Sequence, residues 1–197
     1  MEGEDLILKD IFKNFSNGFY VDIGSYHPLH LSNTFLLYRR GWRGINIDLS
    51  KYSIDLFNHI RNDDLNINAA ITNFDGKINY FYQKELSQIT TVKKKTALKR
   101  MQGQIKEREI QAFKLDTILS NSKYKNKKID FLNIDVEDAD FDALCSIDFN
   151  IYRPKVICIE IDEINVLDSN IYKFLNKINY KKIWSSKSNL SHIFLDS

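Results

Sequence analysis

The sequence predicts an α/β fold in which helices cover both faces of a mostly parallel, doubly wound sheet. Short apolar runs alternate along the chain with segments whose apolar residues recur at helical spacing, and this alternation is the pattern of parallel sheets. The run at residues 19–23 contains Asp22 and leads into Gly24. The next run, at residues 44–48, ends in Asp48. Such strand ends are typical of sheets that bind a nucleotide-type ligand at their carboxyl edge.

The first half of the chain is expected to place a helix beside each strand. Residues 5–15 have apolar side chains at roughly helical spacing. The polar side chains of residues 32–34 can cap a short helix at residues 35–38, which Gly41 then ends. Ser50 can cap the helix that follows the second strand. The predicted strands are residues 19–23, 44–48 and 66–71, followed by a turn at 73–76 and an antiparallel strand at 77–82.

The second half is expected to complete the sheet. Residues 115–119 begin a helix whose positive end lies beside Asp116. Phe141, Leu144 and Ile147 are spaced to share one helix face. The remaining predicted elements are strands at 129–134 and 156–161, a helix at 171–178, and a closing hairpin of residues 180–184 and 190–195 with its turn near Ser188 and Asn189. Residues 1–197 are therefore expected to form one domain.

The segment at residues 84–110 shows no regular pattern, so irregular structure is predicted there. Seven of the 28 basic residues lie between positions 93 and 108. They are Lys93, Lys94, Lys95, Lys99, Arg100, Lys106 and Arg108. The segment is either a solvated helix face or a basic flap over a substrate pocket, and a flap of this charge would favour an anionic acceptor.

The composition indicates an ordinary globular protein. Of the 197 residues, 43% are hydrophobic and 27% are charged, and the net charge of +2 indicates neither a nucleic-acid nor a membrane partner. No apolar run approaches the ~20 residues that a membrane span requires. Cys145 and Cys158 show neither metal-ligand spacing nor a disulfide framework, which favours a reducing compartment. The acidic N-terminus is unlike that of a signal peptide, so a cytoplasmic location is expected.

The ends of the first two strands predict the cofactor. A dinucleotide motif needs three spaced glycines to hold a pyrophosphate, and here only Gly24 is present. One glycine fits a cofactor with a ribose and an amino-acid tail, namely S-adenosylmethionine. Asp48 is expected to accept hydrogen bonds from the ribose hydroxyls, and Asp22 to orient the turn or meet the ammonium group. The candidate cofactor-binding residues are Asp22, Gly24, Ser25, Tyr26, Asn33, Asp48, Leu49, Asn68, Ala69 and Asp135.

The loop after the third strand is expected to lie beside the adenine ring. Residues 68–70 include small side chains that leave room for the ring. Each part of this site also has a purely structural explanation. These explanations are an ordinary turn around Gly24, a helix cap at Asp48 and a well-packed strand end at residues 68–70.

An acidic cluster follows the fourth strand. Asp135, Glu137, Asp138 and Asp140 lie within six residues, and such acids are costly at the end of a buried strand unless something uses them. If the strand geometry continues, Asp135 and Glu137 point the same way. The acids can accept a proton from a hydroxyl, hold a divalent cation or bind the cofactor ammonium group. The structural alternative is that they cap the next helix.

Further candidates come from other strand ends. Glu160 and Asp162 repeat the acidic pattern after the fifth strand. His27 follows the first strand, and a histidine there is an available base near neutral pH. His59 and His192 are expected at the surface or at a sheet edge. The candidate catalytic residues are Glu137, Asp135 and His27; no metal ligand is assigned, and a divalent metal stays open.

The motifs together resemble a known family over nearly the whole chain. They are YVDIGSYHP at residues 20–28, SNT at 32–34, YRRGWRGINID at 38–48, LDTIL at 115–119, IDFLNIDVE at 129–137 and YRPKVICIE at 152–160. The chain resembles the FkbM-type S-adenosylmethionine-dependent methyltransferases. The resemblance implies a class I methyltransferase fold with strand order 3-2-1-4-5-7-6, and methyl transfer to oxygen on sugars or polyketide products. The family usually has Gly where this chain has Asp138, whose side chain could narrow the pocket or add a ligand.

Other functions remain as alternatives. Amino-directed DNA methyltransferases carry an Asn/Asp-Pro-Pro-aromatic motif where this chain has residues 135–138, and base-carbon enzymes need a Pro-Cys pair that neither Pro28 nor Pro154 makes. A nicotinamide oxidoreductase would need the missing glycines. A methyltransferase fold without activity, acting as a binding module, has Asp138 as its one hint. The leading prediction is an O-methyltransferase acting on a sugar, glycan or related small molecule.

Overall fold

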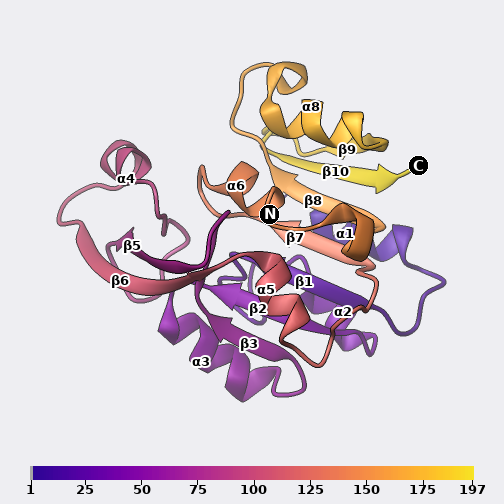
Figure 1. Ribbon diagram of the computed structural model, residues 1–197, viewed down its shortest axis with the longest axis horizontal. Helices are drawn as coiled ribbons and strands as arrows, with labels where there is room; N and C mark the ends of the chain where they lie inside the picture. Colours follow the sequence, from indigo (N-terminus) through magenta and orange to yellow (C-terminus); the bar gives the residue numbers. More distant parts are fainter. Residues whose placement is uncertain (1) are drawn as a thin grey trace.

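The structure, a computed structural model, describes residues 2–197 and confirms the α/β class. Its main sheet consists of β1 (Phe19–Ile23), β2 (Arg43–Asp48), β3 (Leu65–Asn68), β7 (Phe131–Ile134), β8 (Val156–Glu160), β9 (Tyr180–Ser185) and β10 (Ser191–Asp196). The order is β3-β2-β1-β7-β8-β10-β9, as the resemblance implies (Figure 1). Strands β3, β2, β1, β7 and β8 run parallel, and β10 is antiparallel to both of its neighbours.

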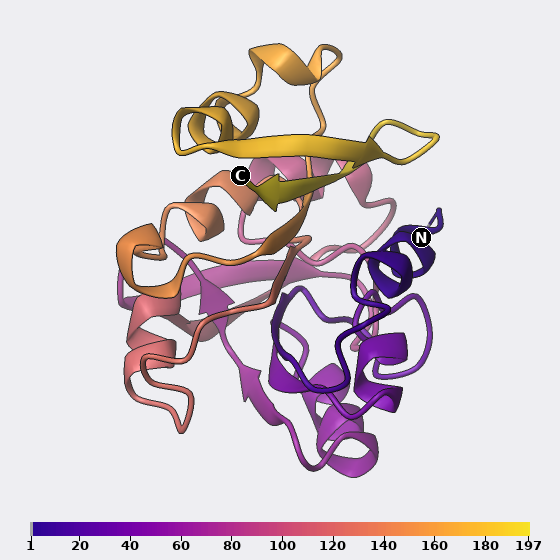
Figure 2. The same cartoon turned by 90° about the vertical axis from the view of Figure 1, so that its right-hand side faces the viewer.

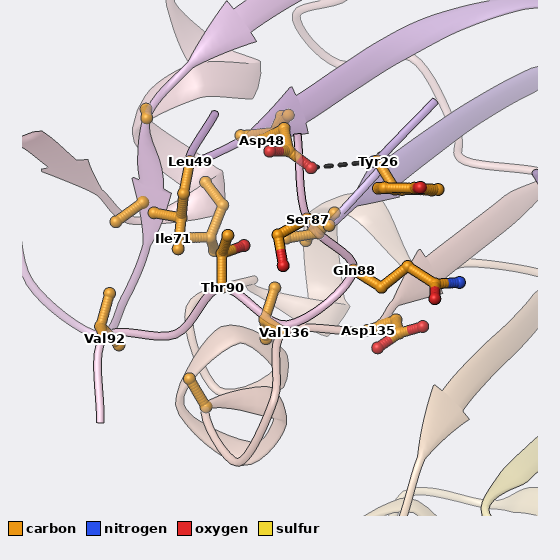
Figure 3. Close-up of a pocket in the computed structure, with 16 residues that line it drawn as sticks. Tyr26, Asp48, Leu49, Ile71, Ser87, Gln88, Thr90, Val92, Asp135 and Val136 are labelled. Atoms are coloured by element: carbon orange, nitrogen blue, oxygen red, sulfur yellow. Dashed lines mark hydrogen bonds between the residues drawn. The ribbon is translucent and has the colours of Figure 1, made fainter. Parts of the chain in front are cut away.

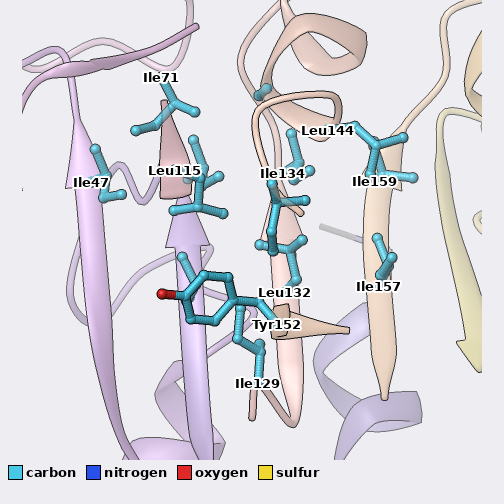
Figure 4. Packing of buried hydrophobic residues seen from close by; sticks show 14 of the residues in the cluster. Ile47, Ile71, Leu115, Ile129, Leu132, Ile134, Leu144, Tyr152, Ile157 and Ile159 are labelled. Atoms are coloured by element: carbon cyan, nitrogen blue, oxygen red, sulfur yellow. The ribbon is translucent and has the colours of Figure 1, made fainter. Parts of the chain in front are cut away.

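Helices cover both faces of the main sheet (Figure 2). They are α1 (Glu4–Ile11) and α2 (Phe35–Arg39) on one face, and α5 (Leu115–Ser120), α6 (Asp140–Leu144), α7 (Phe149–Tyr152) and α8 (Asn170–Lys177) on the other. Helix α3 (Lys51–Ile60) packs along β2 and β3. Strand β1 is buried throughout: Tyr20 joins the core under α1, whereas Val21 and Ile23 join the core under α5. Figure 4 shows the α5-side core, where Ile47, Ile134 and Ile159 share one face.

A second sheet departs from the prediction. It has three strands in the order β4 (Ala70–Ile71), β6 (Lys106–Phe113) and β5 (Gly76–Tyr82). The single strand expected at residues 66–71 is wrong, because β3 ends at Asn68 and β4 pairs with β6 instead. Strand β5 is antiparallel as expected, with β6 as its partner.

Residues 84–110 are more regular than the sequence predicts. They contain α4 (Lys94–Arg100) and the first part of β6. Strand β6 lacks an apolar alternation because most of it lies at the surface. There Glu109 pairs with Lys77 of β5 at 2.7 Å, and Glu107 accepts from Asn79. Cross-strand polar pairs stabilise such a strand without a hydrophobic pattern, so the prediction of irregular structure is wrong here.

The helix expected around residues 141–147 is shorter than predicted, because α6 ends at Leu144 and a second short helix, α7, follows it. Asp148 begins the second helix, since its carboxylate accepts from the N–H of Asn150 at 2.8 Å. The strand expected at residues 129–134 begins only at Phe131.

His59 is exposed, as expected. His192, however, is neither at the surface nor at a sheet edge. It is completely buried in β10, which lies between β8 and β9. Its ring nitrogens contact the Ser185 hydroxyl at 2.9 Å and the Asn189 carbonyl at 3.1 Å. Burial lowers the pKa of His192 to about 4. Within residues 2–197, no helix has the length and apolar character needed to cross a membrane.

Candidate active site

Two adjoining cavities open at the carboxyl ends of β1, β2 and β7. The first has a volume of about 510 Å³, part of which is open to solvent, and is lined mainly by apolar side chains (Figure 3). The second has a volume of about 930 Å³, also partly open to solvent, and is lined mainly by polar side chains. Gly24, Tyr26, Gln88 and Asp135 line both, so the cavities form one continuous site.

The structure brings most of the predicted cofactor residues to these walls. Those on the first cavity are Gly24, Tyr26, Asp48, Leu49, Ala69 and Asp135, and the second adds Asp22, Ser25 and Asn33. Asn68 lines neither cavity. Its amide instead donates to the carbonyl oxygens of Asp48 and Leu49 at 3.0 and 2.9 Å. The expected cofactor contact of Asn68 therefore becomes a role in holding the loop after β2.

Gly24 lies where the turns after β1 and β7 meet. Its φ of 79° is in the left-handed region, which glycine adopts readily. A Cβ atom at this position would lie 1.8 Å from the carbonyl oxygen of Asp135. The N–H of Gly24 also donates to the carbonyl oxygen of Ile47 at 2.9 Å. Glycine here therefore allows three strand ends to converge on the site.

Asp48 joins the turn after β1 to the turn after β2. Its Oδ2 accepts from the N–H of Tyr26 at 2.8 Å, and its Oδ1 accepts from the N–H of Ser50 at 2.7 Å. Burial raises the pKa of Asp48 to about 6, although the two backbone donors oppose the shift. Each carboxylate oxygen can accept a second hydrogen bond. The contact with ribose hydroxyls stays a prediction that this geometry permits.

We expect Asp48→Asn to weaken the binding of S-adenosylhomocysteine, the demethylated form of the expected cofactor, at least tenfold. The amide places a donor against a backbone N–H and removes a charge-assisted hydrogen bond worth about 1.5–3 kcal/mol. Because the pKa of Asp48 is about 6, affinity in the unsubstituted protein should also fall as the pH drops below 6. Calorimetry measures both effects, with the exposed Asp55→Asn as control. Unchanged affinity in Asp48→Asn would place the ribose contact elsewhere.

Glu137 occupies a left-handed turn after β7. The expected continuation of strand geometry is wrong, because β7 ends at Ile134 and Glu137 has a φ of 53°. Glu137 is only 8% exposed, lines the second cavity and pairs with the guanidinium of Arg100. Burial, helped by Asp135, outweighs Arg100 and raises the pKa of Glu137 to about 7. A carboxylate with that pKa can accept a proton near neutral pH.

Asp135 and Glu160 share the second cavity with Glu137. Burial and the nearby Asp22 raise the pKa of Asp135, and burial and Asp135 raise the pKa of Glu160. Neighbouring carboxyl groups of this kind retain a proton between them more readily than isolated acids do. Over residues 2–197, no three His, Cys, Asp or Glu side chains are arranged to hold a metal ion.

Residues 87–100, here called the roof, lie over both cavities. In the view of Figure 3, Ser87, Gln88 and Thr90 lie between Asp48 and the loop that carries Asp135 and Val136. Two contacts besides the Arg100–Glu137 pair tie the roof to the loop after β7: Thr91 Oγ1 to the Glu137 carbonyl oxygen at 2.8 Å and Thr96 Oγ1 to Asp138 Oδ2 at 2.5 Å. A third ties it to α6, from Lys93 Nζ to Asp142 Oδ2 at 2.5 Å. The roof thus covers the loop after β7, which carries Asp135, Glu137 and Asp138, together with the turns after β1 and β2.

Asp138 does not narrow the pocket as expected. Its φ of 69° is a conformation that glycine adopts most readily and that aspartate tolerates. Its side chain lines neither of the two cavities. Because its Oδ2 accepts from Thr96 of the roof, the carboxylate holds the roof in place.

Most basic residues of the roof do not line the site. Among residues 2–197, Arg100 is the only basic side chain that lines either cavity, and it is already paired with Glu137. Lys94, Lys95 and Lys99 are exposed. The expectation of an anionic acceptor therefore lacks the basic lining on which it depended.

His27 does not line either cavity. Its Nδ1 accepts from the N–H groups of Leu29 and His30, each at 3.1 Å, and burial lowers its pKa. These contacts hold the turn after β1. The structure therefore does not bring His27 together with Glu137 and Asp135.

Four residues of the second cavity are not among those that the sequence singled out, namely Leu31, Gln88, Ile89 and Asn133. Asn133 gave the clearest signal, because it is a polar residue inside the apolar run of β7. It lies beside Asp22 of β1 in the sheet register. Leu31, with a φ of 53° and a side chain 48% exposed, has an unusual conformation that its sequence context does not reveal.

The sequence matches the family described as Methyltransferase FkbM domain over residues 22–182. A methyltransferase FkbM from Methylobacillus flagellatus KT superposes with a TM-score of 0.61 at 10% identity, over 91% of this chain and 44% of that one. A TehB-like SAM-dependent methyltransferase from Corynebacterium glutamicum ATCC 13032 Kitasato superposes with a TM-score of 0.50 at 11% identity, over 100% of this chain and 89% of that one. None of the curated proteins matches.

The family match and the two structural similarities agree with the strand order of the main sheet and with the site at the ends of β1, β2 and β7. At 10 and 11% identity the two solved structures support the fold alone, and the chain spans less than half the length of the first. The family match extends from Asp22 through the turn after β2 and the acidic loop after β7. The chain therefore belongs to the FkbM methyltransferase domain family.

Proposed function

We propose that this chain is an S-adenosylmethionine-dependent O-methyltransferase that acts on a hydroxyl group of a sugar, a glycan or a related small molecule. The observation that supports this most is Glu137, a buried carboxylate whose pKa is about 7 and which lines a polar cavity joined to an apolar one. Methyl transfer to a hydroxyl group requires a residue that takes up the hydroxyl proton.

The residues present fit the cofactor that family membership implies. Apolar side chains of the first cavity, such as Leu49 and Ile71, offer contact area for adenine, and Asp48 offers acceptors for ribose. On the second cavity, Asn33 has a buried side-chain oxygen without a donor, and an ammonium group is such a donor. When bound, the cofactor supplies an electrophilic methyl group on a positively charged sulfur.

The chain's own residues position the acceptor and move its proton. The acceptor hydroxyl gives its proton to a carboxylate oxygen of Glu137 while the hydroxyl oxygen becomes the nucleophile. Arg100, paired with Glu137, holds that carboxylate in position.

The lining of the second cavity favours a neutral acceptor. Asp22, Asp135, Glu137 and Glu160 line this cavity together with one cation, Arg100, which is already paired. An anionic acceptor would find no unpaired cation on this cavity within residues 2–197, and those of the carboxyl groups that are ionised would repel it. Sugar hydroxyls can donate hydrogen bonds to carboxylates without that penalty.

The proposal is tested with a methyl-labelled donor and a panel of neutral glycans, nucleotide sugars and lipid-linked sugars. We expect label in a methyl ether of a neutral acceptor. The exposed triple variant Lys94→Gln, Lys95→Gln, Lys99→Gln should leave the KM for that acceptor unchanged. A salt-dependent rise in KM with an anionic acceptor would instead support the basic flap. No label in any acceptor, with intact binding of S-adenosylhomocysteine, would indicate a binding module.

A further inference from the structure

Arg61 is completely buried at the C-terminal end of α3. Its guanidinium donates to the carbonyl oxygen of Pro28 at 2.9 Å and to the hydroxyls of Ser32 and Thr34, each at 2.8 Å. It forms no ion pair with any carboxylate in the described part of the chain. A buried cation is costly, so its hydrogen bonds to the loop at residues 28–34 need an explanation.

The hydrogen bonds that begin at Arg61 can run in one direction only. An arginine only donates, so Thr34 accepts from Arg61 and gives its single hydroxyl proton to Asp22 Oδ2 at 2.7 Å. The carboxylate of Asp22 only accepts, so Asn133 turns its NH₂ group to Asp22 Oδ1 at 2.9 Å. This leaves the oxygen of Asn133 facing Asn33, whose NH₂ group donates to it at 3.0 Å.

The chain of hydrogen bonds ends at an acceptor. Asn33 Oδ1 is buried and has no donor among residues 2–197. Turning the amide over would not help, because two amide oxygens would then face each other across the Asn33–Asn133 contact. Asn33, Asn133 and Asp22 all line the second cavity. A buried acceptor without a donor is destabilising, and a ligand that donates at this wall would satisfy it.

We propose that the relay Arg61–Thr34–Asp22–Asn133–Asn33 presents the Asn33 oxygen as the acceptor for the ammonium group of the cofactor. Arg61 is a positioning residue that does not line the cavity. Its charge and the Thr34 hydrogen bond both favour the ionised form of Asp22, and a carboxylate that accepts at both oxygens sets the direction of the two amide hydrogen bonds. Both oxygens of Asp22 already hold a donor, so Asp22 orients the relay. The inference rests on the proposed function, since the ammonium group belongs to the amino-acid tail of S-adenosylmethionine.

Calorimetry with three ligands tests the relay. They are S-adenosylhomocysteine, its analogue with hydrogen in place of the amino group, and 5′-methylthioadenosine, which lacks the amino-acid tail. In the unsubstituted protein, loss of the amino group should weaken binding about tenfold or more. Thr34→Val and Asn33→Ala should bring the ratio of the dissociation constants of the deaminated analogue and S-adenosylhomocysteine close to one. Both variants should leave the affinity for 5′-methylthioadenosine unchanged. Thr34→Ser, which keeps the hydroxyl, should restore the ratio.

Thermal melting establishes that each variant is folded. Thr72→Val also removes a buried hydroxyl, one that donates to the Phe74 carbonyl oxygen at 2.7 Å, and should keep the full ratio. If Thr34→Val does not fold, Asn33→Ala still decides, because Asn33 is only partly buried. A full ratio in a folded Asn33→Ala would overturn the relay while leaving the methyltransferase proposal intact. If the ratio falls to one in Asn33→Ala but the unsubstituted protein methylates no acceptor, the relay is supported and the proposed reaction is contradicted.

Discussion

Gly24→Ala is expected to abolish cofactor binding and to lower the melting temperature. The added methyl group would lie 1.8 Å from the Asp135 carbonyl oxygen, so the turns after β1 and β7 must move apart. The φ of 79° adds strain for alanine of about 1–2 kcal/mol. The separated turns form the wall that both cavities share, so adenosine and amino-acid contacts should be lost together. Calorimetry with S-adenosylhomocysteine and thermal melting measure the two effects.

Gly103→Ala separates the clash from the backbone strain. Gly103 has a similar φ of 89°, but the nearest atom to a Cβ there, outside the adjoining residues, would be the Gln83 amide nitrogen at 3.9 Å. This variant should lose a little stability and keep cofactor affinity. Normal affinity in Gly24→Ala would mean that the close approach of the two turns is not needed for binding.

The sheet and one wall of the site could be predicted because their signals are local. Strands β1, β2 and β7 are apolar runs that end at Ile23, Asp48 and Ile134, and parallel strands place their carboxyl ends at one edge of the sheet. Asp22, Gly24 and Asp48 therefore meet at the cavities as expected. The prediction needed only the positions of strand ends, and these are visible in the sequence.

A flap over the pocket is one of the two expectations for residues 84–110, but the contacts of the roof and the relay could not be predicted, because the residues that make them are distant in sequence. Asn133 and Asp22 are 111 residues apart, and Thr91 is 46 residues from Glu137. Such pairs follow from the order of the strands and leave no periodic pattern. His192 is similar: its burial depends on the insertion of β10 between β8 and β9, whereas the sequence shows only a terminal hairpin.

The second large effect is expected for Glu137→Gln, which should lower kcat by about 10²–10⁴ and leave cofactor affinity unchanged. Glutamine keeps the shape, and its oxygen can still accept from Arg100, but it cannot take up a proton. Because the pKa of Glu137 is about 7, kcat in the unsubstituted enzyme should rise with pH up to about 7 and then level off. The variant should lack this step. Label transfer at several pH values and calorimetry measure the two quantities.

Matched variants identify the base among the neighbouring groups. His27→Ala should keep the rise of kcat up to about pH 7, because His27 lines neither cavity and acts only on the turn after β1. Retained turnover in Glu137→Gln together with loss in Glu160→Gln would move the role to Glu160. Loss of activity with a chelator and recovery with a divalent ion would make these carboxylates metal ligands.

The stability of Glu137→Gln distinguishes a lost base from a damaged site. Since the folded protein raises the pKa of Glu137 from 4.5 to about 7, the folded state binds this proton more tightly than the unfolded state does. The stabilisation that the folded state gains from binding this proton is therefore full below pH 4.5 and is lost as the pH rises through 7. Glutamine resembles the protonated form at every pH, so at pH values above the pKa of Glu137 the variant should melt at a higher temperature than the unsubstituted protein while turning over more slowly. A variant that lost both stability and turnover would instead indicate that the turn after β7 had been disrupted.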